Sequence, residues 1–142
     1  MKYDLIFYLA KKTGYCEKRL IKTMKQIGAE PNRIVSAASP SALGEETTHS
    51  LRLVPLVVIV GGLGSTDDDN LATVLSRVLS NSTLTLDNIR RLPAPDSEEG
   101  DPAGYIIRYK SQMILALPDN PDAIEGLLTD DLLAYIREKA GK

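Results

Sequence analysis

The sequence predicts a three-layer α/β/α domain with a mostly parallel sheet and a C-terminal β-hairpin. An unbroken apolar run, Pro-Leu-Val-Val-Ile-Val at residues 55–60, is typical of a central strand covered on both faces. Short apolar runs alternate with helical patterns around it, and strand–helix units joined in succession form parallel sheets through right-handed crossovers. With 142 residues, the chain has the usual length of one compact domain, so we expect a single domain over residues 1–142.

The first half of the chain predicts two strands and two helices. Residues 3–10 form a short apolar run typical of a buried strand. Apolar residues then recur three or four apart over 15–27, and Gly28 stands where a C-terminal cap belongs. The chain extends again over 33–38. A serine N-cap and a first-turn proline then predict a weaker helix over 39–53.

The second half predicts a helix, a long loop, a hairpin and a C-terminal helix. Apolar residues at i, i+3, i+4, i+7 and i+8 over 71–79 indicate an amphipathic helix. Residues 81–104 are rich in proline, acids and glycine, which predicts a flexible loop inserted in the domain. Two short apolar runs, 105–109 and 112–117, are separated by two residues and predict the hairpin. An Asn-Pro pair at 120–121 then caps and opens a helix, and Thr129 is expected to cap a further turn that runs to Lys139.

Charge and cysteine content exclude several classes of partner. The formal charge of -2 offers no broad positive field, so neither nucleic acid nor anionic lipid is expected to bind. No apolar run approaches the ~20 residues needed to cross a bilayer, and the first one lacks the features of a signal peptide. Cys16 is the only cysteine, which rules out an internal disulfide. We expect a cytoplasmic protein.

A glycine loop, Gly61-Gly62-Leu63-Gly64-Ser65, lies between the predicted central strand and the next predicted helix. Ligands bind at this place in open α/β sheets. Glycines let backbone N–H groups approach a phosphate, and the helix N-terminus adds unpaired donors. The pattern is neither the dinucleotide fingerprint nor a P-loop. The alternative is that the glycines only provide a steep strand-to-helix turn.

Thr66-Asp67-Asp68-Asp69 follows directly, at the start of the predicted helix. Acids in a first turn are stabilised by the helix dipole, and Thr66 with Asp69 would form a capping box. Three successive acids exceed what a cap needs and would repel a bare phosphate. A Mg²⁺ ion held by Asp68 and Asp69 would reconcile the acids with a phosphorylated ligand.

Residues 60–69 resemble the Thr-Gly-Gly-x-Gly…Asp signature of the molybdopterin-binding domain, most closely its version in CinA-type proteins. Asp69 matches the functional aspartate of that family. Further along, Ala103-Gly104-Tyr105 is similar to the family's Pro-Gly-Phe stretch. Leu117-Pro118-Asp119-Asn120-Pro121 is similar to its Leu-Pro-Gly-Asn-Pro or Leu-Pro-Gly-Val-Pro turn.

The resemblance implies a site for a phosphorylated pterin or nucleotide, such as molybdopterin, in a homo-oligomer. Family branches act in molybdenum cofactor biosynthesis, by adenylyl transfer to molybdopterin or by metal insertion, and in CinA-like nucleotide pyrophosphate hydrolysis. In this chain Asp69 would be the catalytic residue and would orient ligand or Mg²⁺. The implied ligand-binding residues are Gly61, Gly62, Gly64, Ser65, Thr66, Pro118, Asn120 and Pro121.

The chain also departs from the family at three places. Residues 8–14 lack the acidic motif that normally ends the first strand, and Leu71 replaces the usual threonine. Asp119 replaces a glycine whose backbone would lie close to the ligand, and its carboxylate narrows the site and repels anions. The alternative is therefore a catalytically inactive member that serves as an oligomerisation or protein-interaction module. Whether the chain is an enzyme stays open.

The remaining candidates favour structural roles. His49 is the only histidine and has no partner near it in sequence, which favours a surface position. Cys16 belongs to the apolar stripe of its helix and is expected in the core. Tyr105 is expected to pack, although a planar pterin could stack on it. Asp130 and Asp131 are expected to be first-turn acids of a helix.

Overall fold

A computed structural model of the chain describes residues 1–10, 13–61, 89–93, 102–109 and 112–140. Its elements in chain order are β1 (Lys2–Tyr8), α1 (Thr13–Met24), the 3₁₀ turn η1 (Lys25–Ile27), β2 (Glu30–Ala37), α2 (Pro40–Leu51), β3 (Leu56–Val60), β4 (Ile89–Pro93), β5 (Pro102–Tyr109), β6 (Gln112–Leu117), α4 (Pro121–Leu127) and α5 (Asp130–Ala140).

The described strands form one six-stranded sheet in the order β2-β1-β3-β6-β5-β4. β1 pairs in parallel with β2 and β3, and β3 pairs in parallel with β6. β5 runs antiparallel to both β6 and β4. The mostly parallel sheet and the C-terminal hairpin are therefore confirmed. β3 lies near the middle, and all five of its residues are buried, as its uniformly apolar sequence predicted.

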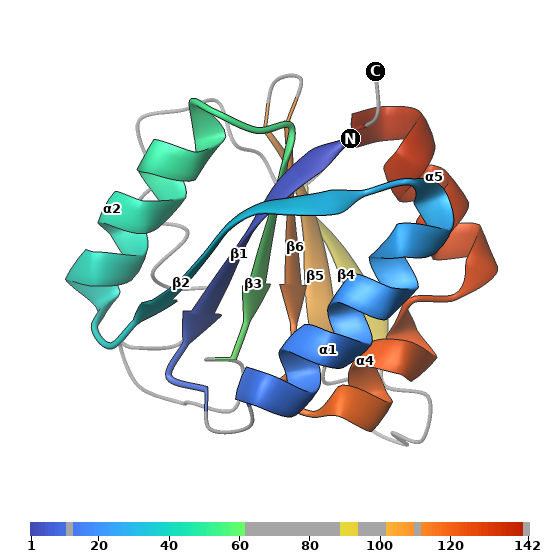
Figure 1. Cartoon of the computed structure of the whole chain (residues 1–142), viewed down its shortest axis with the longest axis horizontal. Coiled ribbons are helices and arrows are strands. Elements are labelled where there is room, and N and C mark those ends of the chain that lie inside the picture. Colours follow the sequence, from blue (N-terminus) through green and yellow to red (C-terminus); the bar gives the residue numbers. More distant parts are fainter. Residues whose placement is uncertain (11–12, 62–88, 94–101, 110–111, 141–142) are drawn as a thin grey trace.

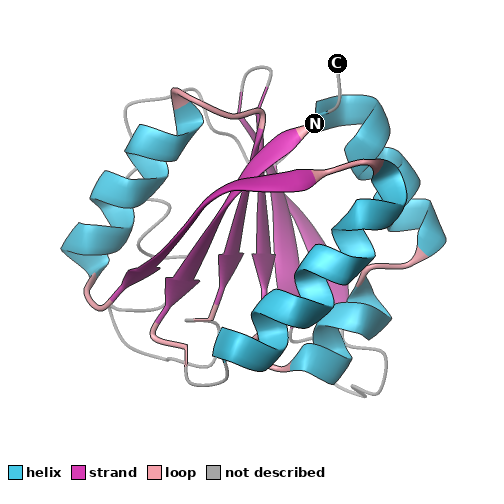
Figure 2. Cartoon of the chain, viewed as in Figure 1, coloured by secondary structure: helices cyan, strands magenta, loops and turns pink. Residues whose placement is uncertain are grey.

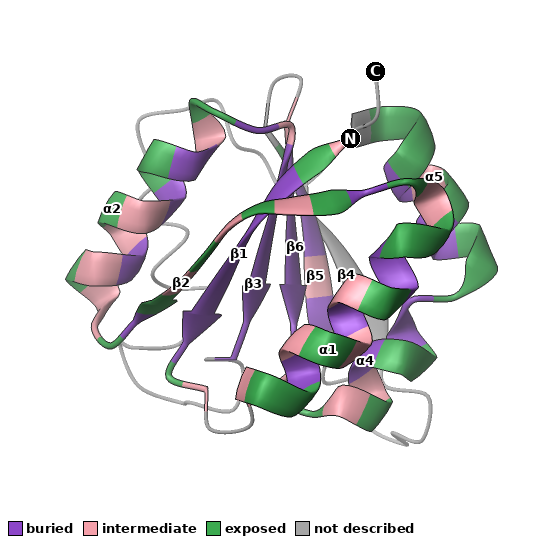
Figure 3. Ribbon diagram, in the orientation of Figure 1, coloured by how far each residue is buried: buried purple, intermediate pink, exposed green. Residues whose placement is uncertain are grey.

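Helices cover both faces of the sheet, which gives three layers (Figures 1 and 2). Side chains alternate along each strand, so Leu5 and Phe7 of β1 belong to one core while Ile6 and Tyr8 belong to the other. The first core lies under α1, α4 and α5, and the second lies under α2. Purple segments in Figure 3 show the buried sheet between these helices.

Local cap motifs formed as predicted. The Ser39 hydroxyl accepts a hydrogen bond from the backbone N–H of Ala42 at 3.1 Å and caps α2, with Pro40 in its first turn. Gly28 takes the left-handed conformation, φ 72°, directly after η1. Thr129 accepts from the Leu132 N–H at 3.2 Å and caps α5. These motifs depend on neighbours within three residues and so can be recognised in the sequence.

The predicted loop over residues 81–104 was wrong in part. Residues 89–93 form β4 and Pro102 begins β5, and the two strands pair with each other. Pro93 stands at the end of an edge strand, where the sheet tolerates a residue without an N–H. The rest of that loop, and the predicted helix over 71–79, lie outside the described residues. None of the described helices is long and apolar enough to cross a membrane.

Candidate functional site

Gly61, the first residue of the glycine motif, and the 118–121 turn lie at the carboxyl ends of adjacent parallel strands. Gly61 follows β3 and the 118–121 turn follows β6. The Gly61 backbone N–H donates to the carbonyl oxygen of Leu117 at 2.9 Å, which fastens the start of the glycine loop to the start of the turn. The carboxyl edge of an open parallel sheet is where ligands bind. The structure thus brings Gly61 next to Leu117, which is more than fifty residues away in the sequence.

Gly61 packs against the end of β1 so closely that only glycine fits. Its φ is 108°, which L side chains rarely adopt. A Cβ atom there would lie 2.1 Å from the carbonyl oxygen of Tyr8, a backbone atom that cannot rotate away. The first glycine of the loop therefore sets the close approach of β1 and β3 at the edge where the site would lie.

Asn120 uses its side-chain oxygen to begin α4. Its Oδ1 accepts from the backbone N–H groups of Asp122 at 3.0 Å and Ala123 at 3.3 Å, and Pro121 occupies the first helical turn. Asn120 is exposed, and its own N–H donates to the Pro118 carbonyl at 2.9 Å. The cap was predicted. The role of the Asn120 amide toward a ligand stays a prediction.

Asp119, the residue that replaces the family glycine, is tied to α1. The buried Cys16 thiol donates to Asp119 Oδ1 at 3.6 Å. Cys16 lies in the core, as predicted, but its link to a residue 103 positions away was missed because nothing near either residue indicates it. Arg19 adds ion pairs to Asp122, at 3.6 Å, and to Glu125. The turn after β6 and the helix α4 that follows it are therefore tied to α1 by three polar contacts.

The other predicted site residues lie outside the described part of the chain. They are Gly62, Gly64, Ser65, Thr66, Asp68 and Asp69, together with Leu71. The metal site at Asp68 and Asp69 and the catalytic role of Asp69 therefore stay predictions. Within the described ranges, no three His, Cys, Asp or Glu side chains are grouped closely enough to hold a metal ion.

A partly buried charge cluster under α2 was missed. Asp4 is fully buried in β1, accepts from Asn32 Nδ2 at 3.0 Å and faces Arg33 Nε at 3.5 Å. Arg33 also pairs with Glu46 at 2.7 Å and donates to Ser50 at 2.8 Å. The one indication in the sequence is an acid inside an apolar strand. The cluster joins β1, β2 and α2 and so has a structural role.

The weaker candidates take the structural positions predicted for them. His49 is exposed on α2, and Tyr105 is half-buried and packs against the core under α2. Asp130 and Asp131 are exposed in the first turn of α5. The pKa of Tyr3, which is fully buried in the other core, is raised to about 12 by burial and then by the charge of Glu17.

This geometry defines a class of protein: an open, mostly parallel α/β domain in which the residues that follow β3 and β6 are joined at the carboxyl edge of the sheet. No family model matches the chain. A CinA-like protein of Desulfotalea psychrophila is 29% identical over an alignment that covers 67% of this chain. The chain spans 29% of the length of that relative.

Solved structures agree on the fold. CinA of unknown function from Thermoplasma acidophilum has a TM-score of 0.70 at 17% identity, with 96% of each chain covered. Molybdenum cofactor biosynthesis protein B has a TM-score of 0.74 at 13% identity, with 99% of this chain and 94% of that chain covered. The chain therefore has the same fold as these CinA and molybdenum cofactor biosynthesis structures, and its sequence is similar to that of CinA-like proteins.

Proposed function

We propose that this chain binds a phosphorylated pterin or nucleotide between the glycine loop at 61–65 and the turn at 118–121. The hydrogen bond from Gly61 N–H to the Leu117 carbonyl supports the proposal most directly, because it joins the first residue of the glycine loop to the residue just before the turn. The Gly61 N–H is used in that bond. Gly62 and Gly64 are therefore the residues proposed to donate backbone N–H groups to phosphate.

Asp69 is proposed to orient the ligand or a Mg²⁺ ion bound to its phosphate. Mg²⁺ is commonly held by one or two carboxylates together with substrate phosphates, which suits Asp68 and Asp69 beside a phosphate-binding loop. In the enzyme version of this proposal the metal would supply charge neutralisation for phosphoryl-type transfer. The residues of the chain would bind and position the ligand.

Asp119 favours a second candidate, a catalytically inactive module that keeps the fold for oligomerisation or for binding a protein. The family's glycine would let the backbone approach a ligand, and Asp119 instead places a carboxylate in this turn. Its bond to Cys16 gives the carboxylate a structural use within the fold. A residue used in this way needs no ligand to explain it.

Isothermal titration distinguishes the two candidates. ATP, ADP-ribose and molybdopterin would each be titrated into the protein with and without Mg²⁺. Saturable heat that depends on Mg²⁺ is expected for the ligand-binding domain. The absence of heat with all three ligands would favour the inactive module.

Asp69→Asn tests the role of the aspartate. We expect it to weaken Mg²⁺-dependent binding by about tenfold or more, the size of loss seen when groups around a metal site are removed. Asp131→Asn, an exposed acid in α5, is the matched control and should bind like the unaltered protein. Equal affinities for the Asp69→Asn variant and the unaltered protein would rule out the assigned role.

A further inference from the structure

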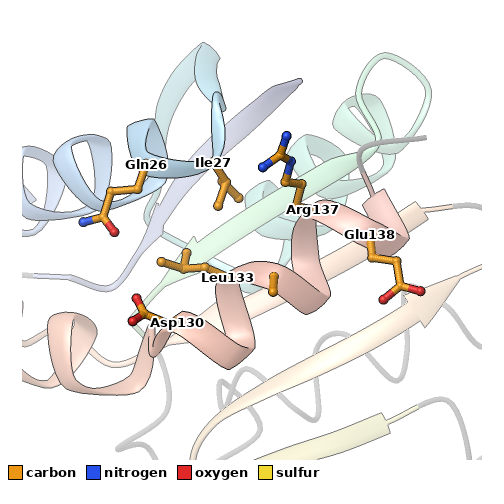
Figure 4. A pocket seen from close by; sticks show the side chains of 7 residues that line it. Gln26, Ile27, Asp130, Leu133, Arg137 and Glu138 are labelled. Atoms are coloured by element: carbon orange, nitrogen blue, oxygen red, sulfur yellow. The ribbon is translucent and has the colours of Figure 1, made fainter.

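A pocket lies between η1 and α5, at the other end of the sheet from Gly61. It has a volume of about 500 Å³, which is within the range of small-ligand sites. η1 comes just before β2 begins, so the pocket lies near the amino end of the sheet, whereas the glycine loop follows the carboxyl end of β3. Figure 4 shows its lining residues, Gln26, Ile27, Asp130, Leu133, Ala134, Arg137 and Glu138.

One face of α5 provides the floor and both charged ends of this pocket. Asp130, Leu133, Ala134 and Arg137 are spaced i, i+3, i+4 and i+7, so they line one face of the helix. Leu133 is buried, and Ile27 of η1 faces it from the other wall. Two helical turns separate the acid from the base, which is about 10 Å along the axis. The pocket therefore has an apolar middle between a carboxylate and a guanidinium.

Both charged groups lack a partner within the part of the chain that the structure describes. Neither Asp130 nor Arg137 makes a hydrogen bond or ion pair among the described residues, whereas Glu138 pairs with Lys139 at 3.9 Å. Both side chains are exposed. In Figure 4 the Arg137 side chain extends toward Ile27, and Asp130 lies at the opposite end near Gln26. These charges can accept an external ligand without breaking a contact within the fold.

A purely structural explanation of these charges is available and can be separated from binding. Acids in the first turn and bases in the last turn of α5 stabilise the helix through its dipole. Asp131 and Lys139 have the same places in the helix, yet neither lines the pocket. If these charges act only through the helix dipole, substituting Asp130 should have the same effect as substituting Asp131, and substituting Arg137 the same effect as substituting Lys139. If the pocket binds a ligand, only the substitutions of Asp130 and Arg137 should weaken that binding.

We propose that this pocket binds a short peptide with free termini. Its carboxylate would pair with Arg137, its amino group with Asp130, and a central apolar side chain would lie on Leu133 and Ile27. Three extended residues span about 10 Å, which matches the separation of the two charges along α5. Gln26 provides an additional amide for the peptide backbone. The site is separate from the proposed phosphate site and does not depend on it.

The test uses the tripeptide Ala-Leu-Ala, its N-acetylated form and its C-amidated form, titrated into the whole chain and followed by backbone amide NMR shifts. We expect shifts centred on residues 26–27 and 133–137. Acetylation or amidation should each weaken binding by about two- to fivefold, as expected for one exposed charge pair. Asp130→Asn should weaken the unmodified and amidated peptides but not the acetylated one. Arg137→Gln should weaken the unmodified and acetylated peptides but not the amidated one.

Asp131→Asn and Lys139→Gln are the matched controls, and both should bind the unmodified peptide like the unaltered protein. The proposal is overturned if no shifts occur at these residues up to about 10 mM peptide, a concentration that detects even millimolar binding. It is also overturned if the control variants weaken binding as much as Asp130→Asn and Arg137→Gln, or if acetylation and amidation leave the affinity unchanged.

Discussion

The backbone is tightly constrained at Gly61, both by its positive φ and by its close approach to Tyr8. The Gly61→Ala substitution would combine an unfavourable φ with a 2.1 Å approach to the Tyr8 carbonyl. We expect it to lower the free energy of unfolding by about 3 kcal/mol, since strain and overpacking each cost roughly 1–3 kcal/mol.

Gly28→Ala separates these two causes. Gly28 also has a positive φ, 72°, but nothing lies within 4 Å of its Cβ position. The Gly28→Ala substitution should lower the free energy of unfolding by only about 1–2 kcal/mol, the penalty of the left-handed conformation alone. Urea unfolding of both variants measures the difference. Equal losses would show that the contact with Tyr8 is unimportant.

The raised pKa of the buried Tyr3 phenol predicts that the protein becomes less stable at alkaline pH. Its pKa rises from 10 to about 12 on folding, so the unfolded chain loses the phenol proton first. The contribution of Tyr3 to stability is therefore complete below pH 10 and falls as the pH rises to 12, by about 1.4 kcal/mol for each pH unit.

Tyr3→Phe should remove this dependence. At pH 7 the substitution should change the free energy of unfolding by less than about 1 kcal/mol, because the buried Tyr3 hydroxyl has no hydrogen-bond partner among the described residues. Urea titrations of both proteins from pH 9 to about pH 11, compared pairwise, isolate the phenol from other titrating groups. Parallel curves for the two proteins would contradict the assignment.

At the scale of elements, α4 depends on its cap. It has seven residues and begins at the turn that belongs to the candidate site. Asn120→Ala removes the acceptor of two backbone N–H groups and should cost about 1 kcal/mol. Asn120→Asp keeps an acceptor at the N-terminus of the helix and should cost close to nothing.

Urea denaturation compares the stability of the two Asn120 variants, and ligand titration then compares their affinity. A ligand contact by the Asn120 amide would make Asn120→Asp bind more weakly although its stability is unchanged. If both variants lose the same stability, the cap is not what fixes this turn.

Some of the helices and strands could be predicted from the sequence, and others could not. The strand at 56–60 was predictable because every residue is apolar, and the caps at Ser39, Asn120 and Thr129 were predictable because their partners lie within three residues. β4 was not, because two arginines and a terminal proline give it no clear alternation, and its pairing with β5 is a contact between distant residues.

At the scale of the whole molecule, the position of the candidate site was predictable and its contacts were not. The order of elements placed the glycine loop and the 118–121 turn at carboxyl ends of strands. The bond of Asp119 to Cys16 joins residues that no local motif links. The cluster around Asp4 also depends on contacts made only after β1, β2 and α2 have packed.

The place of β3 between β1 and β6 affects how the chain folds while the ribosome is still making it. Its partner β6 begins at residue 112, 52 positions after β3 ends at residue 60. At about 5–20 residues per second, a ribosome takes roughly 3–10 s to make that stretch. During this time a wholly apolar strand that is buried in the finished protein has one open edge, which another nascent chain or a chaperone could occupy.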